Sequence, residues 1–419
     1  MSKLLPKLRF DGFSGEWEEK KLIDTADKKI KWSFIGGPFG SNLKASDYVA
    51  KGVRVIQLQN IGDATFHNNY EIYTSKNKAD ELLSNNIYPN EIILSKMGDP
   101  VARACIVPDT HSRYVMCSDG IRLVVDEKKF NKYFIYTYIN SKIFRELAEQ
   151  ISSGSTRKRI GLGDLKKLPL FVPQSLKEQQ KIASCLSSLD NLIEAQNKKV
   201  EALKKHKKGL MQQLFPKEGK TVPTLRFDGF SGEWEEAPIS KYFKTYSGGT
   251  PLTTNKSYYG GNISFIRSAE INKLKTELFL TNEGIENSSA KLVKRGDVLY
   301  ALYGANSGDV AISKIDGAIN QAILCLDSEE SSNSFLYYNL TYLKTKIINQ
   351  YIQGGQGNLS GDIIKSLSVL FPKSQKEQQK IASCLSTLDN IIETQTKKVE
   401  VLKKHKKGLM QQMFVSWER

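Results

Sequence analysis

Residues 177–215 read KEQQKIASCLSSLDNLIEAQNKKVEALKKHKKGLMQQLF, and residues 376–414 repeat this sequence with six substitutions. In both copies apolar residues recur at alternating steps of four and three, the heptad spacing of a helix that packs along one stripe. The predicted seam of the first copy comprises Ile182, Leu186, Leu189, Ile193, Gln196, Val200, Leu203, Lys207, Leu210 and Leu214. The second copy repeats it at Ile381, Leu385, Leu388, Ile392, Gln395, Val399, Leu402, Lys406, Leu409 and Met413.

Two such stripes in one chain favour a coiled coil over a helix that merely covers a globular core. Each helix is the most obvious partner of the other. Equivalent helices related by a two-fold axis pack antiparallel, so we predict an intramolecular antiparallel coiled coil. Gln196 and Gln395 then lie near its middle, where buried polar residues can set the register. A helix of this length spans roughly 50–60 Å, which is long enough for a spacer.

A second repeat frames the two halves of the chain. The sequence LRFDGFSGEWEE occurs at Leu8–Glu19 and again at Leu225–Glu236, each time before a globular segment that ends in one of the helices. Two prolines and a glycine make residues 216–224 the predicted hinge. We therefore divide the chain into a globular domain at 1–176, a coiled-coil helix at 177–215, a linker with the second motif at 216–236, a globular domain at 237–375 and a second helix at 376–419.

The two globular segments show the same order of local signals. Each begins with a glycine turn, at Gly36-Gly37-Pro38 or Gly248-Gly249-Thr250-Pro251. Predicted strands follow at 53–58, 91–94 and 105–107 in the first half, and at 263–267, 297–300 and 310–312 in the second. Aromatic helices are expected at 131–149 and 333–351, each followed by a glycine-rich loop and an apolar strand that ends at Pro173 or Pro372. We predict an α+β fold used twice: two similar globular domains separated by two long antiparallel helices, with pseudo-two-fold symmetry.

Composition narrows the class of protein. The 419 residues carry a net charge of +16, which points to an anionic partner such as nucleic acid, although solvated surface lysines are the alternative. The five cysteines are odd in number and form no close pair, which suits a reducing compartment. No stretch has the length and apolarity of a membrane span. We expect a cytoplasmic protein with no membrane association.

Catalytic motifs are absent from the sequence. There is no GxGxxG after a strand and no Pro-Pro dipeptide of the kind found in amino-methyltransferase motifs. Gly219-Lys220-Thr221 resembles the end of a P-loop, but position 214 is Leu where that motif requires Gly. The four histidines have no metal-ligand spacing. We therefore expect no catalytic residue, no metal site and no cofactor in this chain.

The sequence contains clearer signs of DNA binding than of catalysis. Arg157, Lys158 and Arg159 lie beside Gly154 in a loop, where long cationic side chains can reach a phosphate or a guanine edge. The corresponding loop of the second half offers amides, which can pair with adenine. Its candidates are Gln353, Gln356 and Asn358. A solvated loop is the alternative reading for both.

Further DNA-binding candidates are Lys96 and Arg103 around Gly98, Tyr303, Asn306 and Ser307 around Gly304, and, more weakly, Arg267. The lysine-rich runs at 204–208 and 403–408 can contact phosphate or a protein partner, but solvated helix ends explain them equally well.

The duplicated architecture resembles the specificity subunit of type I restriction-modification enzymes (HsdS) over nearly the whole chain. The resemblance rests on two repeated features. One is the tandem LRFDGFSGEW segment. The other is a predicted strand end, Leu170-Phe171-Val172-Pro173 or Leu370-Phe371-Pro372, which is followed in each half by KEQQKIASCL. The run Gly249-Thr250-Pro251, with Tyr258-Tyr259-Gly260-Gly261 and Phe265-Ile266-Arg267, is also typical of target recognition domains in this family.

The resemblance implies a non-catalytic DNA reader. Each globular half would be a target recognition domain for one half of an asymmetric, bipartite, gapped site in double-stranded DNA, and the helices would fix the gap. Two methylation subunits (HsdM) would bring S-adenosylmethionine and adenine-N6 chemistry, and two restriction subunits (HsdR) would bring ATP- and Mg²⁺-dependent translocation and cleavage. We expect half-sites about one helical turn, or roughly 34 Å, apart. A coiled-coil adaptor explains the helices but not the diverged basic domains, and a stand-alone enzyme needs motifs that are missing.

Overall fold

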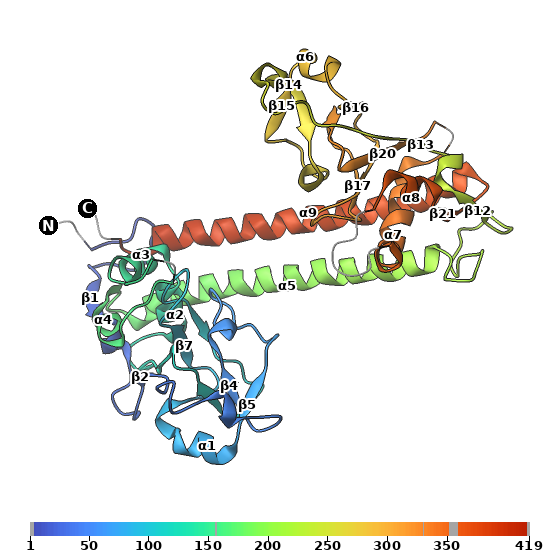
Figure 1. Ribbon diagram of the computed structural model, residues 1–419. Coiled ribbons are helices and arrows are strands. Elements are labelled where there is room, and N and C mark those ends of the chain that lie inside the picture. Colours follow the sequence, from blue (N-terminus) through green and yellow to red (C-terminus); the bar gives the residue numbers. More distant parts are fainter. Residues whose placement is uncertain (1–3, 156, 330, 352–358, 417–419) are drawn as a thin grey trace. The chain divides into compact units, whose positions relative to one another are not determined.

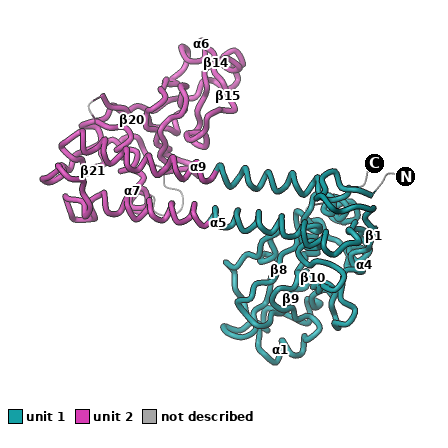
Figure 2. The backbone as a smooth tube through the Cα atoms, turned by 180° about the vertical axis from the view of Figure 1, so that it is seen from behind, with its two compact units in different colours: residues 1–197, 397–419 teal, residues 198–396 magenta. Residues whose placement is uncertain are grey.

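The computed structural model describes residues 4–155, 157–329, 331–351 and 359–416 (Figure 1). The chain forms two compact units: unit 1 comprises residues 1–197 and 397–419, and unit 2 comprises residues 198–396 (Figure 2). Two helices of 39 residues each, α5 (Leu176–Leu214) and α9 (Gln375–Met413), run from one unit into the other. Each helix is about 58 Å long at 1.5 Å per residue. The predicted hinge at 216–224 lies within unit 2.

The helices pair antiparallel in both units. In unit 1 the first half of α5 lies beside the second half of α9, and Lys406 Nζ binds Asp190 at 2.6 Å. In unit 2 the second half of α5 lies beside the first half of α9, and Lys207 Nζ binds Asp389 at 2.6 Å. The seam residues of both helices are buried or half-buried, as a covered stripe requires. The predicted antiparallel pairing is confirmed.

The described residues in the globular part of unit 1 form three sheets. β1 (Glu18–Lys21) pairs with β11 (Pro169–Val172). The second sheet is antiparallel, in the order β2 (Phe34–Gly36), β10 (Gly120–Leu123), β7 (Ile92–Ser95) and β8 (Ala104–Ile106). The third has the order β3 (Tyr48–Val49), β5 (Ile72–Thr74), β4 (Val53–Ile56), β9 (Tyr114–Met116) and β6 (Asn86–Ile87), in which β4 and β9 run parallel.

Unit 2 repeats this topology except for β3, which has no counterpart in its mixed sheet. β12 (Glu235–Pro238) pairs with β21 (Ser368–Phe371). The antiparallel sheet follows the order β13 (Lys244–Ser247), β20 (Ile323–Asp327), β17 (Val298–Ala301) and β18 (Val310–Ile312). The remaining sheet follows the order β15 (Leu278–Leu280), β14 (Tyr259–Ile266), β19 (Gly317–Ile319) and β16 (Lys291–Val293), and again its central pair, β14 and β19, is parallel. The expectation of one mixed fold used twice is therefore met.

The helices of the globular parts differ in one respect from the prediction. Unit 1 has α1 (Lys76–Glu81), α2 (Lys132–Ile139), α3 (Lys142–Gln150) and α4 (Leu162–Lys167), and unit 2 has α6 (Asn282–Glu286), α7 (Asn333–Tyr351) and α8 (Gly361–Ser366). Short 3₁₀ helices lie at Leu22–Thr25, Ala45–Asp47, Leu58–Asn60, Leu83–Asn85, Ile239–Lys241, Lys256–Tyr258 and Ser268–Glu270.

The prediction of a single helix at 131–149 is wrong, because the chain breaks between α2 and α3. Asn140 bonds to the backbone of Ala104 through both ends of its amide, at 3.1 Å each. Ser141 then caps α3 by accepting a hydrogen bond from the Phe144 N–H at 3.3 Å. Side-chain bonds of Asn and Ser to the backbone compete with a continuous helix. In unit 2 the corresponding helix, α7, stays continuous from Asn333 to Tyr351.

Equivalent aromatic contacts join the helix ends to the two cores. Trp17 of the first repeated motif meets Phe134 edge-on at 5.7 Å between ring centroids, and Trp234 meets Phe335 at the same distance. The end of α9 contributes Phe414 to the core of unit 1, and the end of α5 contributes Phe215 to the core of unit 2. The helices are therefore part of each core, which fixes how each globular part sits on them.

Candidate nucleic-acid interface

Two of the predicted DNA-binding segments of unit 1 lie side by side. The backbone after β7 runs along the segment 157–160: Gly98 N donates to Lys158 O at 3.1 Å, and Ile160 N donates to Lys96 O at 2.9 Å. Met97 and Arg159 form an isolated β-bridge. The fold therefore brings Lys96 and the Arg157–Arg159 run, far apart in the sequence, onto one edge of the domain.

The turn between β9 and β10 completes this edge, and sequence reasoning missed it. Asp119 O accepts the Lys96 N–H at 2.7 Å, and the Asp119 carboxylate accepts a hydrogen bond from Arg159 at 2.8 Å. The Lys96 ammonium donates to Ser118 O at 3.2 Å, and burial lowers the pKa of Lys96. Asp119 therefore holds the edge together, and no local sequence signal marks it.

The cations of this edge differ in how firmly they are held. Arg157 is exposed. Lys158 forms an ion pair with Glu149 at 2.7 Å, and Arg159 pairs with Asp119; both pairs are partly exposed. Exposed ion pairs contribute only about 0–1 kcal/mol, so these cations can exchange their partners for phosphate at small cost. Arg103 is held more firmly by the protein itself. Its Nε donates to Ile61 O at 2.6 Å, and its guanidinium lies against Gly98.

Unit 2 places its candidates at the equivalent edge. Tyr303, Asn306 and Ser307 occupy the loop after β17, where Ser307 Oγ donates to Leu302 O at 2.9 Å. Leu359 N also donates to Leu302 O at 2.9 Å, matching the bond between Ile160 and Lys96 in unit 1. The candidates Gln353, Gln356 and Asn358 lie outside the described residues. The described part of this edge carries hydroxyl and amide groups where unit 1 carries cations.

The guanidinium of Arg267 is held by two carboxylates. Arg267 follows β14, in the other sheet of unit 2. Its guanidinium donates to Glu270 at 2.9 Å and to Glu277 at 2.5 Å. These two carboxylates fix the loop between β14 and β15. Arg267 therefore has a structural role in the fold, and its contact with DNA stays a prediction.

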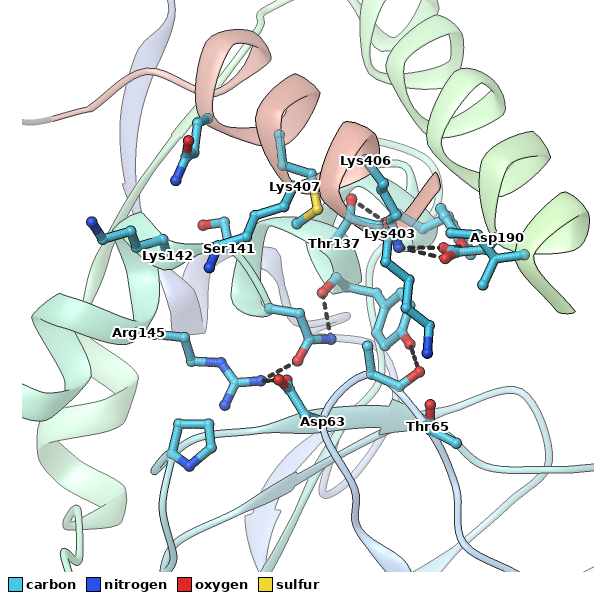
Figure 3. A pocket seen from close by; sticks show the side chains of 18 of the residues that line it. Asp63, Thr65, Thr137, Ser141, Lys142, Arg145, Asp190, Lys403, Lys406 and Lys407 are labelled. Carbon is cyan, nitrogen blue, oxygen red and sulfur yellow. Dashed lines mark hydrogen bonds and ion pairs between the residues drawn. The ribbon is translucent and has the colours of Figure 1, made fainter. Parts of the chain in front are cut away.

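A groove of about 1150 Å³ in unit 1 lies between the helices and the globular part (Figure 3). Lys406 and Asp190 meet at its wall, and the Tyr133 hydroxyl of α2 donates to the same carboxylate. On the opposite side, Arg145 binds Asp63 at 2.7 Å. The groove mixes both signs of charge, and Figure 3 shows Lys403 and Lys407 beside it.

The lysine-rich runs at the helix ends are only partly free. Lys406 and Lys207 are paired with aspartates of the opposite helix, so the solvated reading is wrong for these two. In unit 2, the Tyr338 hydroxyl donates to Asp389 at 2.8 Å, as Tyr133 does to Asp190 in unit 1. The neighbouring Lys403, Lys404 and Lys407 of the second run are exposed.

The described residues contain neither a metal-binding cluster nor a membrane-spanning helix. Among those residues, no group of three or more His, Cys, Asp or Glu side chains is arranged to hold a metal ion. In the same part of the chain, no helix combines the length and apolarity needed to cross a bilayer.

Comparison with known proteins identifies the repeated domain. The model of the type I restriction modification DNA specificity domain matches twice, at residues 39–205 and 231–404. A putative type I restriction enzyme specificity subunit (MjaX) of Methanocaldococcus jannaschii is 31% identical over 66% of this chain. The MjaVIII specificity subunit of the same organism is 25% identical, also over 66% of this chain. The alignments span 65% and 68% of the length of these two relatives.

Solved structures agree on the fold. The S subunit of a type I restriction-modification system from M. genitalium superimposes with a TM-score of 0.62 at 17% identity, covering 99% of this chain and 100% of that one. A chain from a structural study of assembly and conformational transition in a type I system gives a TM-score of 0.56 at 13% identity, covering 94% and 96%. With its two domain matches and its two long antiparallel helices, the chain belongs to the family of type I restriction-modification specificity subunits.

Proposed function

We propose that this chain is the DNA-recognition subunit of a type I restriction-modification complex and carries no catalytic site of its own. Each unit reads one half of an asymmetric, gapped site in double-stranded DNA. The two helices set the length of the gap and provide the docking surface for two methylation subunits. S-adenosylmethionine then belongs to the methylation subunits, and ATP and Mg²⁺ belong to two restriction subunits.

One observation carries the proposal: the two units share a scaffold but present different chemistry at the same edge. The sheet orders, the parallel central pair and the bond from residue 160 or 359 to the loop after β7 or β17 recur in both units. That edge offers Lys96, Arg157 and Arg159 in unit 1, but Tyr303 and Asn306 in unit 2. Cations suit phosphate and guanine, whereas amides suit adenine. Two different readers on one scaffold imply two different half-sites.

The helices support the proposed docking role. They differ at only six of the positions compared between 177–215 and 376–414, so they offer partners two nearly identical surfaces. Two copies of one methylation subunit fit a duplicated surface better than a single partner does.

The methylome of a cell that expresses the chain tests this function. The chain is produced with its neighbouring methylation subunit in a host that lacks adenine methylation, and modified adenines are mapped by sequencing. We expect one gapped motif with two dissimilar halves. A palindromic motif would contradict two different readers. Failure of a soluble complex to methylate would instead favour the adaptor interpretation.

A further inference from the structure

In each unit, one loop at the candidate interface exposes a large apolar side chain. Phe39 is 82% exposed and Leu252 is 65% exposed. Each residue directly follows a proline, Pro38 or Pro251, in the loop that leaves the first strand of the antiparallel sheet, β2 or β13. Single exposed apolar residues are common on proteins. Their recurrence in the same loop of two diverged domains, at the edge proposed to read DNA, indicates a shared role.

Both loops are anchored tightly at their base. A Cβ atom at Gly37 would lie 1.7 Å from Cys117 O, and one at Gly248 would lie 1.8 Å from Ile319 O. Only glycine allows so close an approach of two backbones. The Gly37 N–H also donates to Gly120 O at 2.7 Å, and the Gly249 N–H donates to Ile319 O at 3.2 Å. The Phe39 loop is thus fixed to Gly120 at the start of β10, and the Leu252 loop is fixed to Ile319 at the end of β19.

The loop of Phe39 keeps a defined shape beyond its anchor. Asn42 N donates to Phe39 O at 2.8 Å, which closes a turn around the exposed residue. An apolar side chain on a pre-ordered loop loses little conformational entropy when it enters an interface. Phe39 is therefore held exposed by an ordered loop.

Polar side chains lie beside both loops. In unit 1, the Lys96 ammonium comes within 3.0 Å of the Cβ position of Gly36, and Lys96 and Arg159 both bond to the 118–119 turn. In unit 2, the Thr250 hydroxyl donates to Gln321 at 2.6 Å in the equivalent turn. Cations and amides of this kind contact phosphates and base edges. An apolar side chain gains little from a charged phosphate, and the thymine methyl group and the base faces are apolar features of DNA that suit it.

We propose that Phe39 and Leu252 are specificity-determining residues that make apolar contacts with the bases of the two half-sites, an inference that rests on the proposed function. Two features of DNA offer the same apolar chemistry. One is the C5-methyl group of thymine in the major groove. The other is the exposed face of bases at an opened step, into which Phe and Leu wedges insert in other DNA complexes.

The test compares alanine variants in the complete complex with the methylation subunit. Phe39→Ala and Leu252→Ala are each assayed for methylation rate on DNA that carries the wild-type motif, and for the motif methylated in cells. We expect each variant to lose about 5- to 100-fold in rate. Phe39→Ala should relax the bases required in one half-site only, and Leu252→Ala those in the other half-site only. Phe39→Leu should keep most of the rate, because it preserves an apolar contact.

Two exposed apolar residues away from these loops serve as matched controls. Ile30, 40% exposed, precedes β2 at its opposite end, and Val222, 42% exposed, lies in the 216–224 linker. Ile30→Ala and Val222→Ala should stay within about twofold of the wild-type rate, as expected for surface substitutions that touch no special feature.

Modified DNA separates the two sources of apolar contact. If the thymine methyl is the partner, replacing the contacted thymine by uracil slows the wild-type complex as much as Phe39→Ala does, and the two losses do not add. If an opened step is the partner, 2-aminopurine at that step brightens with the wild-type complex but not with Phe39→Ala. Wild-type rate and motif in both alanine variants would overturn this inference alone. A wild-type complex that methylates no site would overturn the proposed function and the inference with it.

Discussion

Arg9 donates two hydrogen bonds to the two carboxylate oxygens of Glu178, each at 2.8 Å, and Arg226 binds Glu377 in the same way at the same distances. Glu178 and Glu377 are 2% and 1% exposed and lie in the first turns of α5 and α9. Trp17 and Trp234 each add an indole N–H to these carboxylates. The repeated LRFDGFSGEWEE motif is therefore a clamp on the start of the helix that follows it.

The same motif also holds the end of the antiparallel partner helix. Leu8 N donates to Gln412 O in the last turn of α9, and Leu225 N donates to Gln213 O in the last turn of α5, each at 2.9 Å. In each unit the motif thus ties one helix start to one helix end. This explains why the motif and the helix are duplicated together.

Loss of an arginine from this clamp should destabilise its own unit strongly. Arg9→Ala leaves the Glu178 carboxylate buried without its cation, and breaking a buried ion pair costs about 3–5 kcal/mol. Urea unfolding measures the loss, and hydrogen exchange with mass spectrometry should localise it to residues 1–197 and 397–419. Arg226→Ala should cause an equal loss in residues 198–396.

The matched control is an exposed pair in the same unit. Lys142 and Glu146 are 3.5 Å apart with both side chains more than half exposed. Lys142→Ala should cost less than about 1 kcal/mol. Equal urea midpoints for Arg9→Ala and Lys142→Ala would show that the clamp contributes no more than a surface pair.

The lysine–aspartate pairs across the helices should couple measurably to the globular parts. Asp190 accepts hydrogen bonds from Lys406 of α9 and from Tyr133 of α2, and both partners are half-buried. We expect a double-mutant cycle of Lys406→Met and Tyr133→Phe to give a coupling free energy of about 0.5–3 kcal/mol, because both groups share one carboxylate. Additive losses in unfolding free energy would show that the shared carboxylate does not couple them.

The cysteines should differ in how fast their thiols react with an alkylating reagent. Burial raises the pKa of Cys117 to about 11 and that of Cys105 to about 12, whereas Cys185 and Cys384 are half-buried on the helices. The thiolate is the reactive form. Iodoacetamide at pH 8 should therefore label Cys185 and Cys384 first, and the buried thiols only after unfolding. Equal labelling rates for Cys117 and Cys185 in the folded protein would contradict this.

The same shifts predict a loss of stability in alkali. A thiol whose folded pKa lies above its unfolded value of about 8.5 stabilises the protein fully below that pH. This contribution falls as pH rises through about 11 for Cys117 and about 12 for Cys105. Cys117→Ala should flatten the decline in unfolding free energy between pH 9 and about 11, by up to about 1.4 kcal/mol per pH unit.

The cations of unit 1 should act on affinity and on one half-site only. Removing a phosphate contact lowers the salt dependence of binding by about one unit of slope, whereas removing a base contact relaxes the motif. Arg157→Ala should lower the salt dependence of binding, relax the bases required in its own half-site, or do both. It should not change the half-site that Asn306→Ala affects. Lys129→Ala, at a side chain 71% exposed near the start of α2, is the control and should leave both unchanged. Identical effects of Arg157→Ala and Asn306→Ala on both halves would rule out two independent readers.

A heptad inserted into both helices should lengthen the recognised gap. Seven residues add about 10.5 Å of helix, equivalent to about 3 base pairs at 3.4 Å each. Insertion after Asn197 and after Thr396 keeps the seam in phase, because the spacing of a and d positions repeats every seven residues. The motif methylated in cells gives the result. An unchanged gap would mean that the helices do not set the spacing.

The sequence by itself determined the pairing of the helices and the use of one fold twice. Heptad periodicity and near-identity are local properties that a chain displays residue by residue, so two matching stripes specify each other without any knowledge of the globular parts. The same holds for the order of strands and turns, since period-two patterns and glycine turns are also local. Even so, the break at Asn140 was hidden, because it depends on the distant backbone of Ala104.

The tertiary structure alone decided which residues meet. Lys96 and Arg159 share an edge because β7 ends where the 157–160 segment passes, and Asp119 joins them from a third loop. Lys406 finds Asp190, and Arg9 finds Glu178, through separations of 216 and 169 residues. Hydrogen bonds over such separations follow from sheet order and helix register. Neither leaves a periodic trace in the sequence, so the fold had to be built before these partners could be named.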